Sequence, residues 1–517
     1  GGATVYGVIR TSRRGRGLGA AVLALLALLA VGAPGARADE PLPGEPLTPA
    51  AAAEELDEAR AALAGEAPEL DVTMELRDLA LALPYLRGSE RREALALLAR
   101  PPTCDPSPCP VHKDGGPGLV RWSVADTANR DDDATDHFRI HWVTTGPHAA
   151  TPAFVAQLKV LAEHAYDVEN TALGWPEAKP DNGIGKDDKI DIYLADLCDP
   201  GVRCLFGYAA PDPSVPGCSA PTFRCAAYMV LDNDYAEFQG PDEALQATLA
   251  HEYNHVLQFA IDQAMDQWVF ESTATWIEDH VFPDANDWVR TYVPTWARTS
   301  RRPITHAGNS RQYGSAVWNH WLASRFDPDV ILDTWLGARK TRPKHFGVKA
   351  YQRAVRRAGG VGFEREFVHF AAATAEWRAP SSPFPDRDEP KFIDVRRLGT
   401  LRPGRRETFK LNHTAYALKR IKPQGARRLR LVVRAPKGTR SGIALVGRRG
   451  RPRTGEVVRE VRYLQRGGKG RVTLRSARRF RRITAVVVNA DGRLRSKGFR
   501  RSYAHDRREY TVALRGR

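Results

Sequence analysis

Long apolar stretches are scarce in this chain of 517 residues. The most apolar run, residues 18–31, has about 14 residues, whereas a transmembrane helix needs roughly 20. Even so, 42% of the residues are hydrophobic and 11 are tryptophan, which is ample for large buried cores. The composition therefore argues against a multispanning membrane protein and predicts a globular chain of two or three domains.

The short apolar run has the surroundings of a secretory signal. The basic residues 13–16 precede it, and Ala36-Arg37-Ala38 follows it with small residues where signal peptidase cuts. We expect a signal peptide over residues 1–38 and therefore a secreted, extracellular protein. An uncleaved membrane anchor is the alternative.

Cysteine is also scarce, with 6 in the chain, and no pair has the C-x-x-C spacing of structural zinc sites. An even number of cysteines in an exported protein predicts disulfides. Pairing of near neighbours is the simplest of 15 connectivities. It would join Cys104 to Cys109, Cys198 to Cys204, and Cys218 to Cys225. A Cys204–Cys218 bridge and a cysteine-built zinc site are alternatives.

The strongest chemical signal is the run HEYNH, His251 to His255, which matches the H-E-x-x-H pattern of zinc hydrolases. Gly240 and Pro241 predict the start of its helix. Histidines four apart on a helix project from the same face, so both imidazoles can bind one zinc ion. Glu252 lies beside the first histidine, where it can act as general base on a water at the open position of the metal. Catalytic zinc normally has three protein ligands, so a third ligand is expected.

A second helix is predicted from about Trp268, in the run WVFESTATWIED. Glu271 is the candidate third ligand. Glu278, seven residues on, shares its face. It is the candidate to accept a hydrogen bond from the far nitrogen of a ligand histidine and so to fix the orientation of that ring. A helix pair without metal, with both glutamates solvated, is the alternative.

Together these two runs resemble the gluzincin metallopeptidases, in which a helix bearing a glutamate ligand follows H-E-x-x-H. WVFESTATWIED is similar to the W-x-x-E-G-x-A-x-x-x-E run of aminopeptidase-N-like enzymes, with Ser272 where those often have glycine. More loosely, the chain resembles secreted bacterial metalloproteases with a β-rich tail. The resemblance implies an α+β core like that of thermolysin and aminopeptidase N, bound Zn²⁺ and peptide-bond hydrolysis. No G-x-M-E-N motif is present, which favours an endopeptidase.

We expect the zinc metallopeptidase domain to span residues 111–380. The apolar patterns predict a helix over 152–173 and strands over 137–144, 190–194 and 226–231. The resemblance implies that the last strand lies along the cleft, where residues 226–230 would pair with an extended peptide substrate. An ordinary inner strand is the alternative.

A zinc peptidase also needs a hydrogen-bond donor for the developing oxyanion, a role that tyrosine or histidine fills. Tyr313, followed by Gly314 at a predicted helix start, resembles the tyrosine that aminopeptidase-N-like enzymes use. It is our candidate beside Glu252. Tyr292 and His320 are alternatives, and so is a structural role for Tyr313.

Two acidic clusters have the hard oxygen ligands that suit Ca²⁺. Neither fits the twelve-residue calcium loop, so solvated turns are the alternative. The clusters are Asp131, Asp132, Asp133 and Asp136, and Asp181, Asn182, Asp187, Asp188 and Asp191.

The flanking segments differ from this core. Residues 39–110 are predicted as a helical lead-in, with helices over 50–63 and 74–98, that is either an integral part of the protein or a removed propeptide shielding the site. Residues 380–390 have the composition of a linker. From 391 to 517, short alternating apolar runs predict a β-sandwich domain.

Charge is divided unevenly between these parts. Residues 401–517 contain 36 Lys plus Arg and 6 Asp plus Glu, a net +30, and the whole chain carries +16, which leaves 16 − 30 = −14 for the rest. The positive electrostatic potential of the basic region favours an anionic cell-surface polymer as a partner, in addition to a protein or peptide substrate. Nucleic acid is not expected because the basic region lacks an aromatic platform. The alternatives are a catalytically silent surface-binding protein and a basic face that only maintains solubility.

Overall fold

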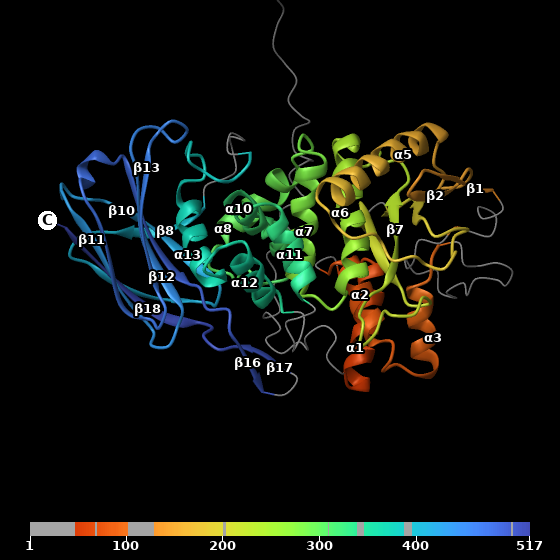
Figure 1. Ribbon diagram of the computed structural model, residues 1–517, viewed down its shortest axis with the longest axis horizontal. Coiled ribbons are helices and arrows are strands. Elements are labelled where there is room, and N and C mark those ends of the chain that lie inside the picture. The colour runs from red at the N-terminus through yellow and green to blue at the C-terminus, as the bar shows by residue number, and fades with distance from the viewer. Residues whose placement is uncertain are drawn as a thin grey trace, which may run out of the picture.

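The structure, a computed structural model, describes residues 47–67, 70–101, 122, 129–199, 203–308, 310–338, 346–386, 395–497 and 500–516. The predicted signal peptide, Cys104 and Cys109 lie outside these ranges. Figure 1 shows a mixed sheet at one end of the molecule, helices in the middle and the C-terminal β-sheets at the other end. A mixed α+β architecture is therefore confirmed, while the thermolysin-like core and the domain boundaries stay predictions.

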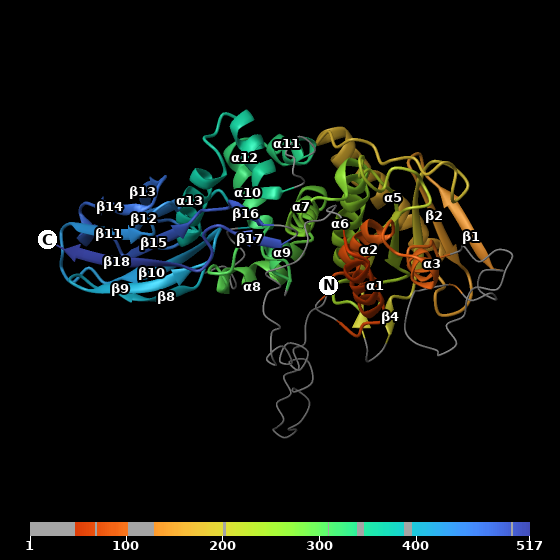
Figure 2. The ribbon, with the colours of Figure 1, turned by 90° about the horizontal axis from the view of Figure 1, so that it is seen from below.

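The N-terminal helices are α1 (Pro49–Leu63), α2 (Val72–Ala82) and α3 (Gly88–Leu97). One helix was predicted over residues 74–98, but the chain breaks between α2 and α3 around Pro84, whose ring cannot occupy a helix interior. The side chain of Asp71 caps α2 by accepting a hydrogen bond from the amide of Met74. These helices cover one face of the mixed sheet, with Leu76 and Leu79 buried in the shared cluster (Figure 2).

The mixed sheet has the strand order β1-β2-β3-β7-β6. Its strands are β1 (Arg130–Ala134), β2 (Phe138–Val143), β3 (Ile190–Ala195), β6 (Gly207–Asp212) and β7 (Ala226–Asp232). β7 pairs with β3 on one side and with β6 on the other, so residues 226–230 lie in an inner strand and the prediction that they receive a substrate strand is wrong. Among the described strands, β6 forms the edge of the sheet on this side of β7.

Helices occupy the other face of the sheet and the middle of the molecule. The large hydrophobic core there contains residues of α6 and α7 and the eight tryptophans between residues 268 and 377. The helices are α5 (Pro152–Tyr166), the π-helix η1 (Asp167–Ala172), α6 (Pro241–Asp262), α7 (Gln267–Val281), the π-helix η2 (Trp288–Tyr292), α8 (Val293–Arg298), α9 (Arg311–Gly314), α10 (Ala316–Arg325), α11 (Asp329–Ala338), α12 (Gly347–Arg357), α13 (Phe363–Ala373) and the short 3₁₀ turn η3 (Thr374–Glu376).

The C-terminal region forms two larger sheets, with the orders β13-β12-β15-β10-β8 and β14-β11-β18-β9, that enclose a common apolar cluster. Their strands are β8 (Arg397–Leu401), β9 (Arg406–Leu411), β10 (Ala415–Ile421), β11 (Leu429–Ala435), β12 (Ser441–Arg448), β13 (Val457–Leu464), β14 (Gly468–Leu474), β15 (Arg482–Asn489) and β18 (Arg508–Gly516). Smaller elements are the pairs β4 (Cys198–Asp199) with β5 (Arg203–Cys204) and β16 (Leu494–Lys497) with β17 (Arg500–Tyr503), and the 3₁₀ turn η4 (Ala477–Arg479).

The outer face of β12, β15 and β10 packs on α13. Val446 and Val488 belong to the same core as Phe370 of α13. The contact is close enough that a Cβ at Gly442 would overlap the side chain of Val368. The sheets and the helices thus share one continuous core that crosses the predicted boundary at residue 391.

Disulfides join Cys198 to Cys204 and Cys218 to Cys225 in the described part of the chain, as near-neighbour pairing predicted. Such bonds fit an oxidising compartment. None of the helices described has the length and apolar character that a membrane span requires.

Candidate metal centre

The helical pair α6 and α7 holds the candidate site. Gly240, with φ of +75°, turns the chain into α6, and Pro241 fills the first turn, where an amide would have no partner. Asp242 and Glu243 complement the positive end of the helix dipole. Residues 263–266 then turn the chain back, so that α7 packs along α6 and faces the histidines.

His251 and His255 of α6 converge on Glu271 of α7, as the sequence predicted. Nε2 of His251 lies 3.2 Å from Oε2 of Glu271, and Nε2 of His255 lies 3.5 Å from Oε1. The two rings are 4.7 Å apart. One ligand atom from each residue falls within 4.8 Å of the others, which is compact enough for a single metal ion.

The polar atoms of this cluster fit a bound cation. His255 Nε2 and Glu271 Oε1 are buried and have no hydrogen-bond partner among the described residues. Buried polar atoms nearly always have partners, because an unpaired one costs about 1–3 kcal/mol. Two imidazole nitrogens and one carboxylate oxygen are ligands that Zn²⁺ accepts, and three of them leave a fourth position open. The residues present therefore suit Zn²⁺.

Outer partners orient both imidazoles. Nδ1 of His251 lies 2.6 Å from Oε1 of Glu278, as predicted, and Nδ1 of His255 lies 2.8 Å from Oε1 of Gln258. Since each Nδ1 is engaged by its outer partner, each Nε2 is the nitrogen that faces Glu271 and is left to bind a metal ion. Gln258 is itself held by a hydrogen bond to the carbonyl of Phe270. Sequence reasoning missed Gln258, although its position three residues after His255 places it on the same helix face.

The charges of the cluster compensate one another in the protein without metal. Burial alone would raise the pKa of Glu271, but His255 and His251 outweigh it and hold the pKa at about 2. For Glu278 burial prevails over the attraction of His251, and its pKa rises to about 7. Burial opposes the charged form of both histidines, yet the carboxylates raise their pKa. The cluster therefore holds a fixed negative ligand between two basic nitrogens.

Glu252 lies beside the cluster, with its side chain 7% exposed. Its Oε2 accepts a hydrogen bond of 3.3 Å from the hydroxyl of Thr73 in α2. Burial raises the pKa of Glu252, and His251 and His255 partly offset the effect. A carboxylate made more basic in this way is suited to taking up a proton.

Tyr313 and its two alternatives separate in space. Tyr313 lies near the metal cluster, with its ring 5.8 Å from that of His251, and its hydroxyl donates to Asp71. Tyr292 stacks on Tyr313 at 4.7 Å. His320 instead packs against Trp288, with ring centroids 4.1 Å apart, and burial lowers its pKa well below the usual value. Tyr313 is thus the best placed of the three, and its role as oxyanion donor stays a prediction.

Arginine side chains form ion pairs with the two acidic clusters that were considered for Ca²⁺. Arg139 bridges Asp132 and Asp187, with both nitrogen–oxygen distances 2.6 Å. Arg100 is buried among the carboxylates of Asp181 and Asp191. These contacts favour ion pairs over calcium, which stays an untested prediction.

Comparison with models of known protein families and with curated protein sequences gave no match. What the chain shows by itself is a buried His–His–Glu cluster that could hold a metal ion, with the geometry expected of an H-E-x-x-H site.

Proposed function

We propose that the chain is a secreted zinc metalloendopeptidase. The observation that carries the proposal is the convergence of His251, His255 and Glu271 on one point, with the carboxylate of Glu252 beside it. A buried acid next to an open metal position is an arrangement used for hydrolysis. The two disulfides fit an exported protein.

The residues divide the chemistry among them. Bound Zn²⁺ would act as a Lewis acid on the scissile carbonyl and would lower the pKa of water at its fourth position. Glu252 takes a proton from the attacking water and gives it to the leaving amine. Tyr313, once released from Asp71, donates its hydroxyl to the oxyanion. Glu278 and Gln258 hold the imidazoles in the tautomer that binds metal.

Glu252→Gln tests this assignment. The amide keeps the shape of the side chain but cannot accept the proton, so casein hydrolysis should fall at least about a hundredfold. Zinc content should stay near one per chain, because Glu252 is not a ligand. Glu169→Gln is the matched control: Glu169 is also buried, but it accepts a hydrogen bond of 2.8 Å from Asn254. Undiminished cleavage by Glu252→Gln would refute the mechanism.

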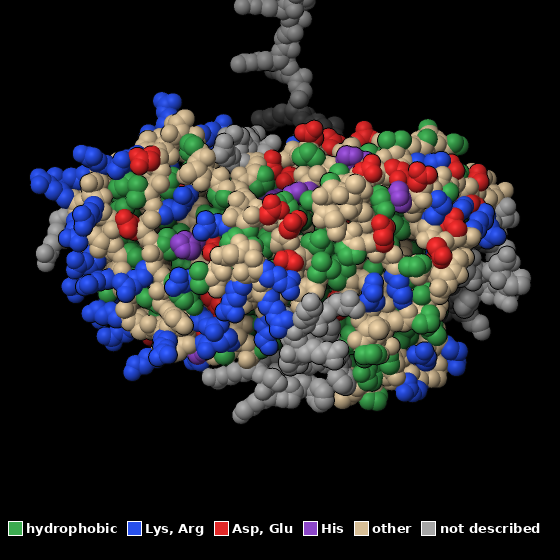
Figure 3. Space-filling view, in the orientation of Figure 1, with side chains coloured by type: hydrophobic (Ala, Val, Ile, Leu, Met, Phe, Trp, Pro, Cys, Tyr) green, Lys and Arg blue, Asp and Glu red, His purple; other side chains and the backbone are tan. Residues whose placement is uncertain are grey.

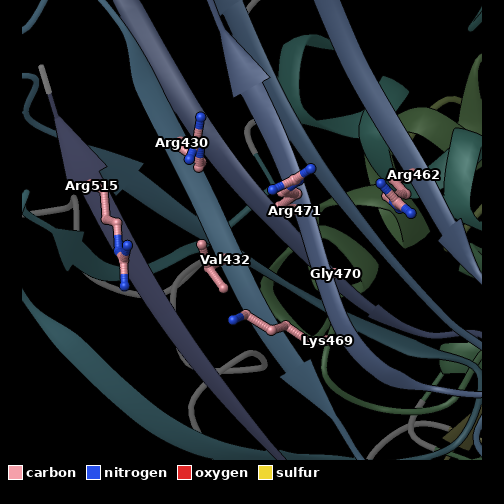
Figure 4. Close-up of a pocket in the computed structure, with 7 residues that line it drawn as sticks. All are labelled: Arg430, Val432, Arg462, Lys469, Gly470, Arg471 and Arg515. Carbon is pink, nitrogen blue, oxygen red and sulfur yellow. The ribbon is translucent and has the colours of Figure 1, made fainter.

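A second candidate function is attachment to an anionic polysaccharide. Lys and Arg side chains gather over the C-terminal sheets (Figure 3). Five of them, on strands β11, β13, β14 and β18, surround a cavity of about 370 Å³ (Figure 4). They are Arg430, Arg462, Lys469, Arg471 and Arg515. Within the described residues, no carboxylate is in ion-pair contact with any of them.

The pairing of these strands makes the unneutralised charge costly. Arg430 lies directly opposite Arg515, and like charges at such positions destabilise a sheet by roughly 0.2–1 kcal/mol. A linear polyanion would neutralise the row. The described lining contains Val432 and Gly470 but no aromatic ring, so stacking of nucleic-acid bases is not favoured.

The full-length double variant Lys469→Glu/Arg471→Glu tests this surface. This variant should elute from immobilised heparin at a lower salt concentration than Arg92→Glu/Arg298→Glu, which makes the same charge change at two exposed residues. Anionic lipid vesicles and a single-stranded oligonucleotide serve as the other arms. Equal retention of both double variants on heparin, or tighter binding to vesicles or oligonucleotide, would refute the polysaccharide site.

A further inference from the structure

We propose that the N-terminal helix α2, with its capping residue Asp71, closes the active site and keeps the enzyme latent until α2 moves away. The inference rests on the metallopeptidase function proposed above. It assigns to α2, and so to the segment 39–110, the shielding of the site that was one of the roles left open for this segment.

Thr73 occupies the space between the general base and the sheet edge. Its hydroxyl donates to Glu252 at 3.3 Å and accepts a hydrogen bond of 3.1 Å from the amide of Ala209. Ala209 belongs to β6, the edge strand that an extended peptide could join. Thr73 thus engages two groups that a substrate would need at once.

Asp71 engages a third group. Its carboxylate accepts the hydroxyl of Tyr313, the candidate oxyanion donor, while its other oxygen caps α2 at Met74. While this contact persists, the hydroxyl of Tyr313 is not free for a substrate. One turn of chain, residues 71–73, therefore occupies the base, the donor and the strand edge together.

Arg77 fastens the same face of the helix one turn further on. Its side chain is 1% exposed and donates to the carbonyl of Met265 in the α6–α7 turn at 2.8 Å. The guanidinium also lies over the ring of Phe270, 5.3 Å from its centroid. A charged group buried in this way forms a strong hydrogen bond. α2 is thus held directly against the two metal-site helices.

The consequence is an enclosed site. His255 and Glu271 are 0% exposed, and Glu252 is 7% exposed. A peptide bond must come within hydrogen-bond reach of the base, which these values do not allow while α2 is in place. Activity then depends on the fraction of molecules in which α2 has opened.

The full-length variant Arg77→Ala tests the inference. Arg87→Ala is its matched control, because Arg87 lies in the same segment and, among the described residues, its guanidinium donates only to the carbonyls of Pro84 and Leu86. We expect Arg77→Ala to cleave casein at least about tenfold faster than Arg87→Ala, since loss of a buried charged hydrogen bond shifts an equilibrium by that factor or more. Thr73→Ala, which keeps the helix intact, should give roughly a threefold gain.

Two readouts are independent of catalysis. Hydrogen exchange of the amides in residues 72–82 should be faster in Arg77→Ala than in the control, because the opened helix loses protection. A chromophoric chelator should also remove zinc faster from Arg77→Ala. If circular dichroism shows that Arg77→Ala is unfolded, the same two readouts are applied to Thr73→Ala and test the inference there.

The outcomes separate the two proposals. If Arg77→Ala and Arg87→Ala match in exchange, zinc removal and rate, the inference is overturned, while an active zinc enzyme leaves the proposed function standing. If α2 opens and zinc becomes accessible but no variant cleaves peptide, the closure by α2 is supported and the peptidase assignment fails.

Discussion

Replacing Glu278 by glutamine should weaken zinc binding without removing a ligand. In the structure, His251 Nδ1 and Glu278 Oε1 are 2.6 Å apart, so the imidazole has a charged acceptor. Glutamine can accept the same hydrogen bond, but a neutral bond is about half as strong, a loss of about 1–2 kcal/mol. That loss corresponds to a roughly five- to thirtyfold higher Kd for Zn²⁺.

Competition with a chromophoric chelator at pH 8 measures this change. Glu278 is ionised at pH 8, because this pH lies above the value of about 7 to which burial raises the pKa of its carboxyl group. The control is Glu169→Gln, the same change at a buried carboxyl group of η1 that accepts a hydrogen bond from Asn254 of α6. Its Kd should stay within about threefold of the parent value. If Glu278→Gln binds zinc as tightly as the parent, or both variants weaken equally, Glu278 does not tune the ligand.

Three further outcomes follow from the same contacts. Zinc affinity should fall as pH is lowered through the raised pKa of His251 and His255, since only neutral imidazole binds metal; calorimetry in two buffers should detect proton release. Burial and Asp386 raise the pKa of Asp279 to about 7, so stability present at pH 4 is lost as pH rises through 7. In Asp279→Asn, up to about 4 kcal/mol of this pH-dependent loss of stability should disappear, which measurements of Tm across the pH range would show. Gly442→Ala should lower the free energy of unfolding by about 1–3 kcal/mol in denaturant titrations, because its methyl group meets Val368.

The His–His–Glu cluster could be predicted because its information is local. The spacing of His251 and His255 fixes a common helix face whatever surrounds it. Glu271 follows after one tight turn, so a helical hairpin brings it back to that face. Gln258 was within reach of the same reasoning, three residues after a ligand.

The elements that the sequence did not predict depend on distant partners. Thr73 meets Glu252 across 179 positions, and nothing in the sequence near either residue indicates the contact. The order of strands in the mixed sheet is equally non-local, which explains why an inner strand, β7, was mistaken for the substrate strand and the edge strand, β6, was missed. Periodicity shows that a strand exists, but pairing with other strands decides whether its backbone is free.

The packing of α13 against β10, β12 and β15 has a consequence for proteolysis. Tyr416 of β10 lies 6.2 Å, ring to ring, from Phe370 of α13, inside the same core as the metal-site helices. A nick near residue 386 would therefore cut the chain without freeing its ends from each other. The two fragments should co-migrate in gel filtration and melt as one calorimetric peak, coming apart only in denaturant.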